Sequence, residues 1–244
     1  MINLVAKIKA KTLSLISDVH DVEISDLRHY CGFKYGCNTF NPYENFIFGL
    51  HSGVNLDLLK ANFNKFLISY RPKNFGEALG INLSKKYPLW CYPWTSHCKV
   101  GNGWVSDPES VPDVMTHFCD LGIPITLVEQ EYFWHQRAYN IIKEFGYTPK
   151  KYGYIELMEI SVKNKKCYIV LDGNHRVSAL SALGLKSVCA KINKSQIYNI
   201  ENVRAFPQVT KMAMSENDSI RIMKKYIDGV NSLPITTGTP SRIC

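Results

Sequence analysis

The sequence predicts an α+β fold, in which a mixed β-sheet core carries flanking helices and a large N-terminal elaboration. Strand-like runs lie at 152–162, 167–171 and 187–192, and the polar turn 163–166 joins the first two. Residues 174–183, between the second and third strands, form a helical segment that Gly184 ends. Strands and helices in this order are typical of a sheet with helices packed against it.

A longer helix is predicted over 131–145, because apolar residues recur there at helical spacing and Gly146 supplies a stop signal. The apolar run 123–128 just before it is predicted to be a strand or an extended segment. The apolar stripe of the helix, which we expect to face the core, consists of Trp134, Ala138, Ile141, Ile142 and Phe145.

Two further helices follow from similar patterns. The first covers about 54–70, where either Asn55 or Asp57 can cap the start. The second lies within 215–230, and its start resembles a capping box with Ser215 as the cap. The first forty residues give a weaker signal, which fits either a packed terminal helix or an amphipathic surface anchor.

Residues 85–112 contain three of the four tryptophans together with several prolines, which predicts a long irregular loop. A short helix is expected after it, over 113–121. The aromatic residues of the loop either wall a substrate cleft or fill the core. These residues are Trp90, Tyr92, Trp94 and Trp104.

The chain carries 29 Lys and Arg residues against 21 Asp and Glu residues, for a net charge of +8. Such a charge suits nucleic acid, acidic lipid or a phosphorylated small molecule. The densest basic runs, 149–151 and 163–166, have the composition of solvated turns, so nucleic acid is disfavoured as a partner. No apolar run has the length of a membrane span, and the eight cysteines include no C-x-x-C pair. We therefore expect a cytoplasmic protein with reduced thiols.

The run Asp172-Gly173-Asn174-His175-Arg176 joins a buried strand to the start of a helix. A helix N-terminus has unpaired N–H groups and a positive dipole end, so each cation there is unfavourable by about 0.3–1 kcal/mol. A histidine and an arginine at that place therefore indicate a negative partner such as phosphate, and Gly173 permits the tight turn. Either Asn174 or Asp172 can cap the helix. The alternative needs no ligand: Asp172 caps the helix, His175 bonds a carbonyl and Arg176 pairs with a carboxylate.

The segment YIVLDGNHRVSALSALGLKSVCAKI resembles the core motif of the ParB/sulfiredoxin superfamily, whose strand–turn–helix–strand unit binds nucleotide phosphates. The resemblance is dense over 155–192, and the helix 131–145 is similar to the one that precedes this core. It implies a nucleotide-binding core over 112–194. The helical and loop-rich N-terminal elaboration over 1–111 does not resemble the family, and from its size we expect it to shape an acceptor pocket. Residues 195–244 then form a C-terminal helical extension and tail.

Three branches of the superfamily can be compared with this turn. Sulfiredoxins carry a catalytic cysteine where this chain has Asn174, which disfavours sulfinate reduction. Partition ParB proteins have an arginine-rich turn and need a helix-turn-helix downstream, whereas one clear helix follows Ile192 here. Free-serine kinases share the pattern D-G-x-H-R, which Asp172, Gly173, His175 and Arg176 reproduce.

The resemblance to the kinase branch implies phosphoryl transfer from ATP or ADP to a hydroxyl of a small metabolite, serine-like or sugar-related, with Mg²⁺ as the companion ion. The alternative is a non-enzymatic nucleotide- or nucleic-acid-binding ParB-like protein. The oligomeric state stays open. The implied nucleotide-binding residues are Asp172, Gly173, Asn174, His175 and Arg176.

The implied catalytic residues are Glu129, Glu131, Asp172 and His175. A base is needed near the acceptor hydroxyl, and either glutamate fits, with Glu129 favoured because it lies closer to the predicted strand end. Either carboxylate can instead be an ordinary residue of a helix N-terminus. No residue is assigned as a ligand of a structural metal.

Overall fold

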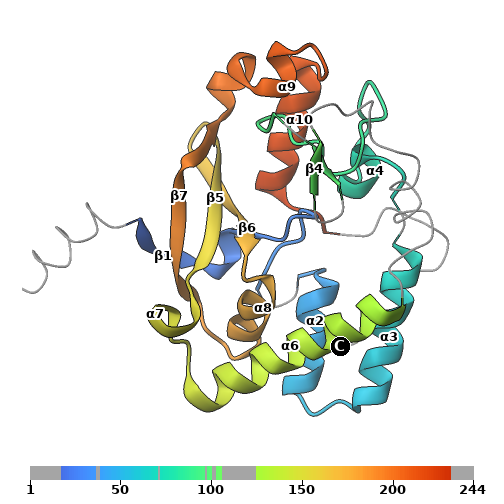
Figure 1. The fold of residues 1–244 in the computed structure, drawn as a ribbon, viewed down its shortest axis with the longest axis vertical. Helices are drawn as coiled ribbons and strands as arrows, with labels where there is room; N and C mark the ends of the chain where they lie inside the picture. Colours follow the sequence, from blue (N-terminus) through green and yellow to red (C-terminus); the bar gives the residue numbers. More distant parts are fainter. Residues whose placement is uncertain are drawn as a thin grey trace, which may run out of the picture.

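The computed structural model describes residues 18–36, 39–70, 72–96, 98–100, 103–105 and 125–231, and it has a mixed α+β architecture built on a five-stranded sheet (Figure 1). The central hairpin of the sheet pairs two antiparallel strands, and a third strand lies parallel to the first of them. The predicted mixed sheet is therefore confirmed. Its strands, in spatial order, are β1 (Val19–Glu23), β7 (Ser187–Asn199), β5 (Ile155–Val162), β6 (Lys165–Asp172) and β2 (Leu27–Arg28).

The three predicted strands are present with shifted ends. β7 continues to Asn199, and the start of the first predicted strand is occupied by a short helix, α7 (Pro149–Tyr152). The two edge strands were not predicted: β1 pairs antiparallel with β7, and β2 pairs parallel with β6. The sheet thus takes strands from both the 1–111 and the 112–194 ranges. Short edge strands depend on pairing with a distant partner, so local sequence gives little sign of them.

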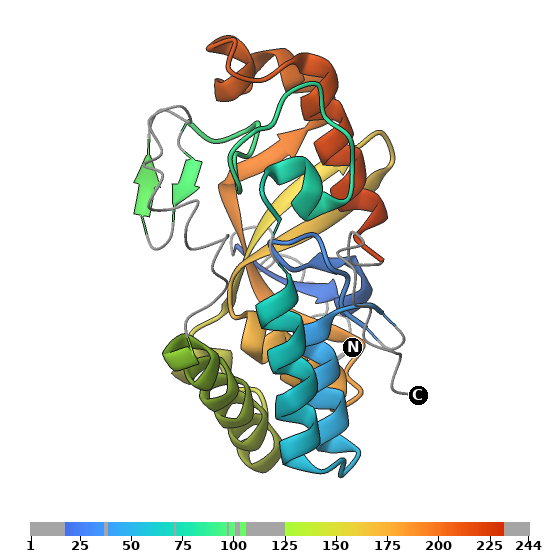
Figure 2. The ribbon, with the colours of Figure 1, turned by 90° about the vertical axis from the view of Figure 1, so that its right-hand side faces the viewer.

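The helices gather in two groups around the sheet (Figures 1 and 2). One group lies at the lower end of the views and includes α2, α3, α6 and α8, with α6 and α2 both contacting α8. In the other group α10 packs against β5 and β6. The bounds are α2 (Pro42–His51), α3 (Leu56–Ser69), α4 (Phe75–Leu79), α6 (Ile125–Phe145), α8 (Asn174–Ala182), α9 (Pro207–Thr210) and α10 (Glu216–Asp228), with 3-10 turns η1 (Ile24–Asp26) and η3 (Ile200–Ala205).

The caps predicted for α3 and α10 agree with the structure, with Asn55 and not Asp57 capping α3. The side chain of Asn55 accepts hydrogen bonds from two backbone N–H groups at the start of α3, and the Ser215 side chain accepts one from Asp218 at the start of α10. Helix α2 was not predicted, although Asn41 caps it and Pro42 occupies its first turn, which is a standard start signal. The carboxylate of Glu44 in α2 is fully buried, and it accepts hydrogen bonds from Gly36 N–H and the Thr39 hydroxyl, both at 2.8 Å.

The prediction of a strand over 123–128 is wrong for its described part, because α6 begins at Ile125. The β-branched residues there lower helix propensity only slightly, and packing in the folded chain outweighs such local preferences.

The predicted buried face of α6 is wrong in most of its residues. Trp134 and Phe145 are 46% and 62% exposed. The buried residues are Tyr132, His135, Tyr139 and Ile142, and of these only Ile142 belongs to the predicted stripe. Three of the four have a polar group, so a pattern of apolar residues misses this face. The hydroxyl of Tyr132 donates to the Lys60 carbonyl, and that of Tyr139 bonds to His51, so both can be buried at little cost.

The aromatic loop contributes to the core. Tyr92 and Trp94 are buried and stacked on each other, and Trp94 also stacks on Tyr198. These two residues therefore fill the core and do not wall a cleft. After this loop, β3 (Cys98–Val100) and β4 (Gly103–Val105) form a small hairpin. The side chain of Trp104, the predicted helix 113–121 and the N-terminal helix fall outside the described residues.

Cys31, Cys91 and Cys167 are buried cysteines, and Cys189 is a partly buried one. Burial raises the pKa of Cys167 to about 12, so its thiol is inert at neutral pH. Among the described residues, no helix combines the length and the apolarity needed to cross a lipid bilayer.

Candidate functional site

The turn after β6 places Gly173 at the N-cap of α8 with a φ of 100°. Only glycine adopts this conformation readily, and a Cβ there would come within 3.0 Å of both Arg176 Nη2 and Ile155 Cγ1. The prediction that Asn174 or Asp172 caps the helix is wrong, since no side chain caps α8. Asn174 Oδ1 instead accepts a hydrogen bond of 2.7 Å from the Tyr35 hydroxyl. The first N–H groups of α8 thus have no side-chain partner within the described chain.

Arg176 holds two segments of chain against this turn. Its Nη2 donates to Asp172 Oδ2 at 2.7 Å, and its Nη1 donates to the Gly153 carbonyl at 2.5 Å. The side chain is 19% exposed, so these contacts are partly shielded from water. The pairing with a carboxylate agrees with the ligand-free alternative for Arg176. Its Nε has no partner among the described residues and is left to bind an anion.

A pocket of about 270 Å³ opens beside the turn, between α6, α7 and the start of α8. The pocket is lined by two arginines and one aspartate, so the net charge of its lining is positive. Two aromatic side chains also line it. The Arg137 guanidinium lies 5.3 Å from the ring centre of Trp134, and Arg137 is exposed. The lining residues that bear on its chemistry are Trp134, Arg137, Tyr152, Asp172, His175 and Arg176.

Sequence reasoning missed Trp134 and Tyr152 as pocket residues. Trp134 was assigned to the core by its place in an apolar stripe, and Tyr152 to a strand. A usable signal was present, because Arg137 follows Trp134 by three positions and such pairs are neighbours on a helix. Arg137 lines the pocket and is also exposed.

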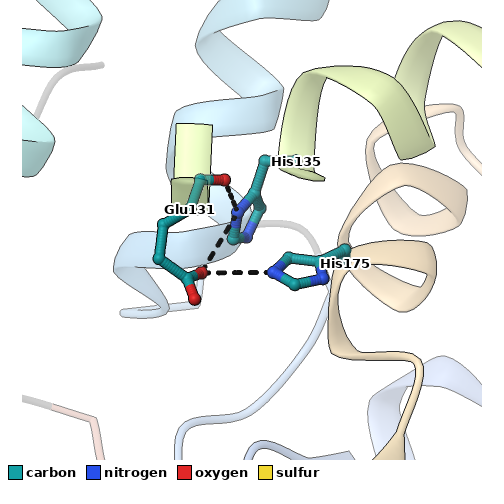
Figure 3. A group of neighbouring side chains, drawn as sticks. All are labelled: Glu131, His135 and His175. Carbon is teal, nitrogen blue, oxygen red and sulfur yellow. Dashed lines mark hydrogen bonds and ion pairs between the residues drawn. The ribbon is translucent and has the colours of Figure 1, made fainter. Parts of the chain in front are cut away.

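Glu131, His135 and His175 form a cluster next to the pocket (Figure 3). Two of them lie one turn apart on α6, and the third comes from the first turn of α8. His175 Nε2 is 3.1 Å from Glu131 Oε2, and His135 Nδ1 is 3.6 Å from the same oxygen. The two imidazole ring centres are 4.3 Å apart, in an edge-to-face arrangement. One ligand-type atom from each residue lies within 4.8 Å of the others.

The environment of this cluster sets its charge. Burial lowers the pKa of His135 to about 3, so its ring is neutral at pH 7, and it is only 1% exposed. Burial alone would raise the pKa of Glu131, but the hydrogen bond from His175 and its charge outweigh burial and lower it. Glu131 is therefore an ionised carboxylate, one-third exposed, at the edge of the pocket.

Five of the predicted site residues lie together at the pocket in the structure, and no described member of the predicted set lies elsewhere in the fold. Asp172, Gly173, His175 and Arg176 line the pocket, and Glu131 contacts His175. Asn174 lies in the turn but turns its side chain to Tyr35. Glu129 belongs to α6, and its side chain falls outside the described part.

The donor set at the pocket fits a Mg²⁺ ion bound mainly through phosphate oxygens. Mg²⁺ commonly takes one or two protein carboxylates and completes its shell with phosphate and water. The Asp172 side chain is 70% exposed, and only one of its oxygens pairs with Arg176. Its other oxygen is therefore available as the single protein ligand.

Comparisons of the chain with protein-family models, with curated proteins and with solved structures find no match.

Proposed function

We propose that this chain is a kinase that transfers a phosphoryl group from ATP or ADP to a hydroxyl of a small metabolite, serine-like or sugar-related. The observation that carries the proposal is the positively charged, aromatic pocket at the N-terminus of α8.

Nucleotide phosphates suit the polar side of the pocket. The free N–H groups of α8 and its dipole favour an anion, while Arg137 and the Nε of Arg176 supply charged donors. Arg137 makes no ion pair among the described residues, so no salt bridge has to break when it binds phosphate. The negative charge of a polyphosphate therefore balances the positive charge of the pocket.

A nucleobase suits the aromatic side. Trp134 and Tyr152 are 46% and 51% exposed, which is high for large rings that line a pocket. Stacking of a base on an aromatic ring contributes about 1–3 kcal/mol to binding. The pocket is small, at about 270 Å³, so we expect the base to lie at its open rim on Trp134.

The resemblance of the turn to the ParB/sulfiredoxin superfamily supports the same reading. The residues of the kinase-like pattern, Asp172, Gly173, His175 and Arg176, all line this one pocket. The order β5–β6–α8–β7, with β7 parallel to β5, agrees with the strand–turn–helix–strand unit expected of that superfamily.

We assign Glu131 as the general base that takes the proton from the acceptor hydroxyl. Its carboxylate is ionised, and the Nε2–H of His175 donates to Oε2 and orients it. As the acceptor oxygen forms its bond to the terminal phosphorus, the bond from that phosphorus to the bridging oxygen breaks. The nucleotide leaves as ADP from ATP, or as AMP from ADP, and the proton passes to Glu131. A Mg²⁺ ion held by the phosphates and Asp172 would neutralise part of the charge that develops there.

The test is an assay of purified full-length protein with ATP or ADP, Mg²⁺ and a panel of hydroxylated metabolites that includes free serine. We expect release of ADP or AMP that depends on one acceptor, with the phosphorylated product detected by mass spectrometry. Slow hydrolysis without acceptor dependence, together with salt-sensitive DNA binding, would favour the non-enzymatic alternative.

Arginine variants test the nucleotide site directly. Arg137→Ala should weaken nucleotide binding by about 10-fold or more, because charge-assisted hydrogen bonds contribute about 1.5–3 kcal/mol. Arg204→Ala is the matched control, since Arg204 is 85% exposed and pairs with Glu216 on α10, away from the pocket. Equal nucleotide affinity in the two variants, measured by titration calorimetry, contradicts the assignment of the pocket.

A further inference from the structure

The cluster of Glu131, His135 and His175 contains a buried nitrogen with no protein partner. His135 is 1% exposed, and its Nε2 makes no hydrogen bond with any described residue. Leaving a buried polar atom unsatisfied costs about 1–3 kcal/mol, so such atoms usually have a function or a missing partner. The hydrogen bond made by the other ring nitrogen, Nδ1, shows whether Nε2 needs a donor or an acceptor as its partner.

The Nδ1 of His135 lies 2.8 Å from the backbone carbonyl of Glu131. A carbonyl oxygen only accepts, so Nδ1 carries the proton and Nε2 presents a bare lone pair. A histidine whose Nδ1–H donates to a backbone carbonyl while Nε2 is free has the arrangement found in metal-ligating histidines.

The two other members complete a donor set. In Figure 3 the outer edge of the His135 ring faces the space between the Glu131 carboxylate and the His175 ring. His175 Nε2 and Glu131 Oε2 are 3.1 Å apart. Ligands held at about 2.0–2.2 Å from one metal ion, at tetrahedral or octahedral angles, lie about 3.0–3.5 Å from each other. This pair thus already has the separation of two ligands of one ion.

We propose that Glu131, His135 and His175 bind one divalent transition-metal ion, for which Zn²⁺ is the best match. Two imidazoles and one carboxylate, with a fourth position open to the pocket, form a recognised zinc donor set, and Fe²⁺ uses the same residue types. This site is separate from the Mg²⁺ that accompanies the nucleotide, because Mg²⁺ prefers oxygen ligands.

The surroundings favour such a site. Aromatic rings of Tyr43, Phe46 and Phe63 surround His135 at centroid distances of 5.8–6.2 Å and shield it from water. His175 and Glu131 are each one-third exposed, so an ion can enter from the pocket side. A bound ion takes the place of the His175 Nε2 proton and holds Glu131 Oε2 where the hydrogen bond holds it in the metal-free chain, so Glu131 Oε1 stays free to accept the acceptor proton.

The experiment uses the full-length chain, stripped of metal with a chelator and then dialysed. Zn²⁺ is titrated by calorimetry, and Co²⁺ is added separately because its absorption spectrum distinguishes nitrogen and oxygen ligands from thiolates. We expect one equivalent of Zn²⁺ to bind, and a Co²⁺ spectrum without thiolate charge-transfer bands. Neither measurement contains nucleotide, so the result is independent of the kinase assay.

Three variants assign the ligands. His175→Gln and Glu131→Gln change partly exposed side chains, and each should weaken Zn²⁺ binding by more than the 10- to 100-fold that outer-shell changes cause. His135→Gln should do the same, with folding checked by circular dichroism. His20→Gln, on β1, is the matched control and should bind Zn²⁺ as the wild type does.

The proposal is overturned if the folded wild type binds no Zn²⁺ at micromolar concentration. It is equally overturned if His175→Gln and Glu131→Gln bind one equivalent with unchanged affinity. If His135→Gln fails to fold, the other two variants still decide the outcome.

Discussion

His175 Nε2 lies 3.1 Å from Glu131 Oε2, so one contact joins the turn after β6 to a helix residue 44 positions earlier in the chain. This contact depends on the packing of α6 against α8. It connects the proposed phosphate pocket to the one described carboxylate that we assign as a proton acceptor. The choice between the two candidate bases, Glu129 and Glu131, can now be tested.

Glu131→Gln should retain nucleotide binding but lower the rate of acceptor-dependent ADP release by about 100-fold or more, the usual contribution of a general base. Glutamine keeps the size and the hydrogen bond from His175 but cannot take up the proton. Steady-state kinetics with calorimetric nucleotide affinity separate the two effects. Glu129→Gln, two residues away on the same helix, is the control. A large loss of turnover in Glu129→Gln with normal turnover in Glu131→Gln reverses our assignment.

Trp134→Ala should weaken nucleotide binding by about 10-fold, because stacking on an aromatic ring contributes about 1–3 kcal/mol. Phe133 provides a matched control: it is the neighbouring aromatic residue, 56% exposed, and does not line the pocket. Quenching of tryptophan fluorescence on addition of ATP should be seen in wild type and in Phe133→Ala, and be reduced in Trp134→Ala. If the two variants bind ATP equally well, the base does not lie on Trp134.

The central strands and α8 could be predicted from the sequence because each has a local signature: a β-rich run, a polar turn, or a glycine stop. Helix caps such as Asn55 and Ser215 are equally local, and both were identified. The edge strands β1 and β2 have no such signature, since each is defined by pairing with a strand more than a hundred residues away.

The turn of the candidate site could be predicted from the sequence, but the cluster beside it could not. The spacing of Glu131 and His135, four positions apart, places both on one face of a helix and was a signal that we did not use. That His175 joins them depends on how α6 packs on α8, which no local pattern encodes. For the same reason Trp134 was assigned to the core, because hydrophobicity alone does not show which face of α6 the other helices cover.

Gly173→Ala should destabilise the protein and also weaken nucleotide binding. Its φ of 100° is strained for alanine, and the new Cβ would crowd Arg176 and Ile155. The control is Gly184→Ala, at the other end of α8, where φ is 83° but no atom lies within 4 Å of the added Cβ. That control measures the free-energy cost of placing alanine in the left-handed backbone region without any added steric contact, which is about 1–2 kcal/mol.

The two glycine variants are compared by urea denaturation. We expect Gly173→Ala to lose more unfolding free energy than Gly184→Ala, with nucleotide affinity reduced in the first variant alone. Equal losses of stability with unchanged affinity in both would show that Gly173 acts through its backbone conformation only.

The contribution of Glu44 to the stability of the protein should fall as the pH rises from about 4.5 to about 7. Burial raises the pKa of Glu44 from 4.5 to about 7, against the opposing effect of its hydrogen bonds from Ser181, Gly36 and Thr39. Between these two values the unfolded chain has lost the proton that the folded chain retains, so each increase in pH favours unfolding. Above pH 7 both states are ionised and the contribution is constant. The whole change is about 3 kcal/mol.

Urea denaturation at a series of pH values measures this dependence, and Glu44→Gln identifies its source. Glutamine fits the same buried site and does not titrate, so the unfolding free energy of the wild type relative to the variant should decrease between pH 4.5 and 7. Subtracting the two curves removes the titration of every group that both proteins share. Parallel curves would mean that Glu44 is ionised in the folded protein throughout this range, with its hydrogen bonds compensating fully for burial.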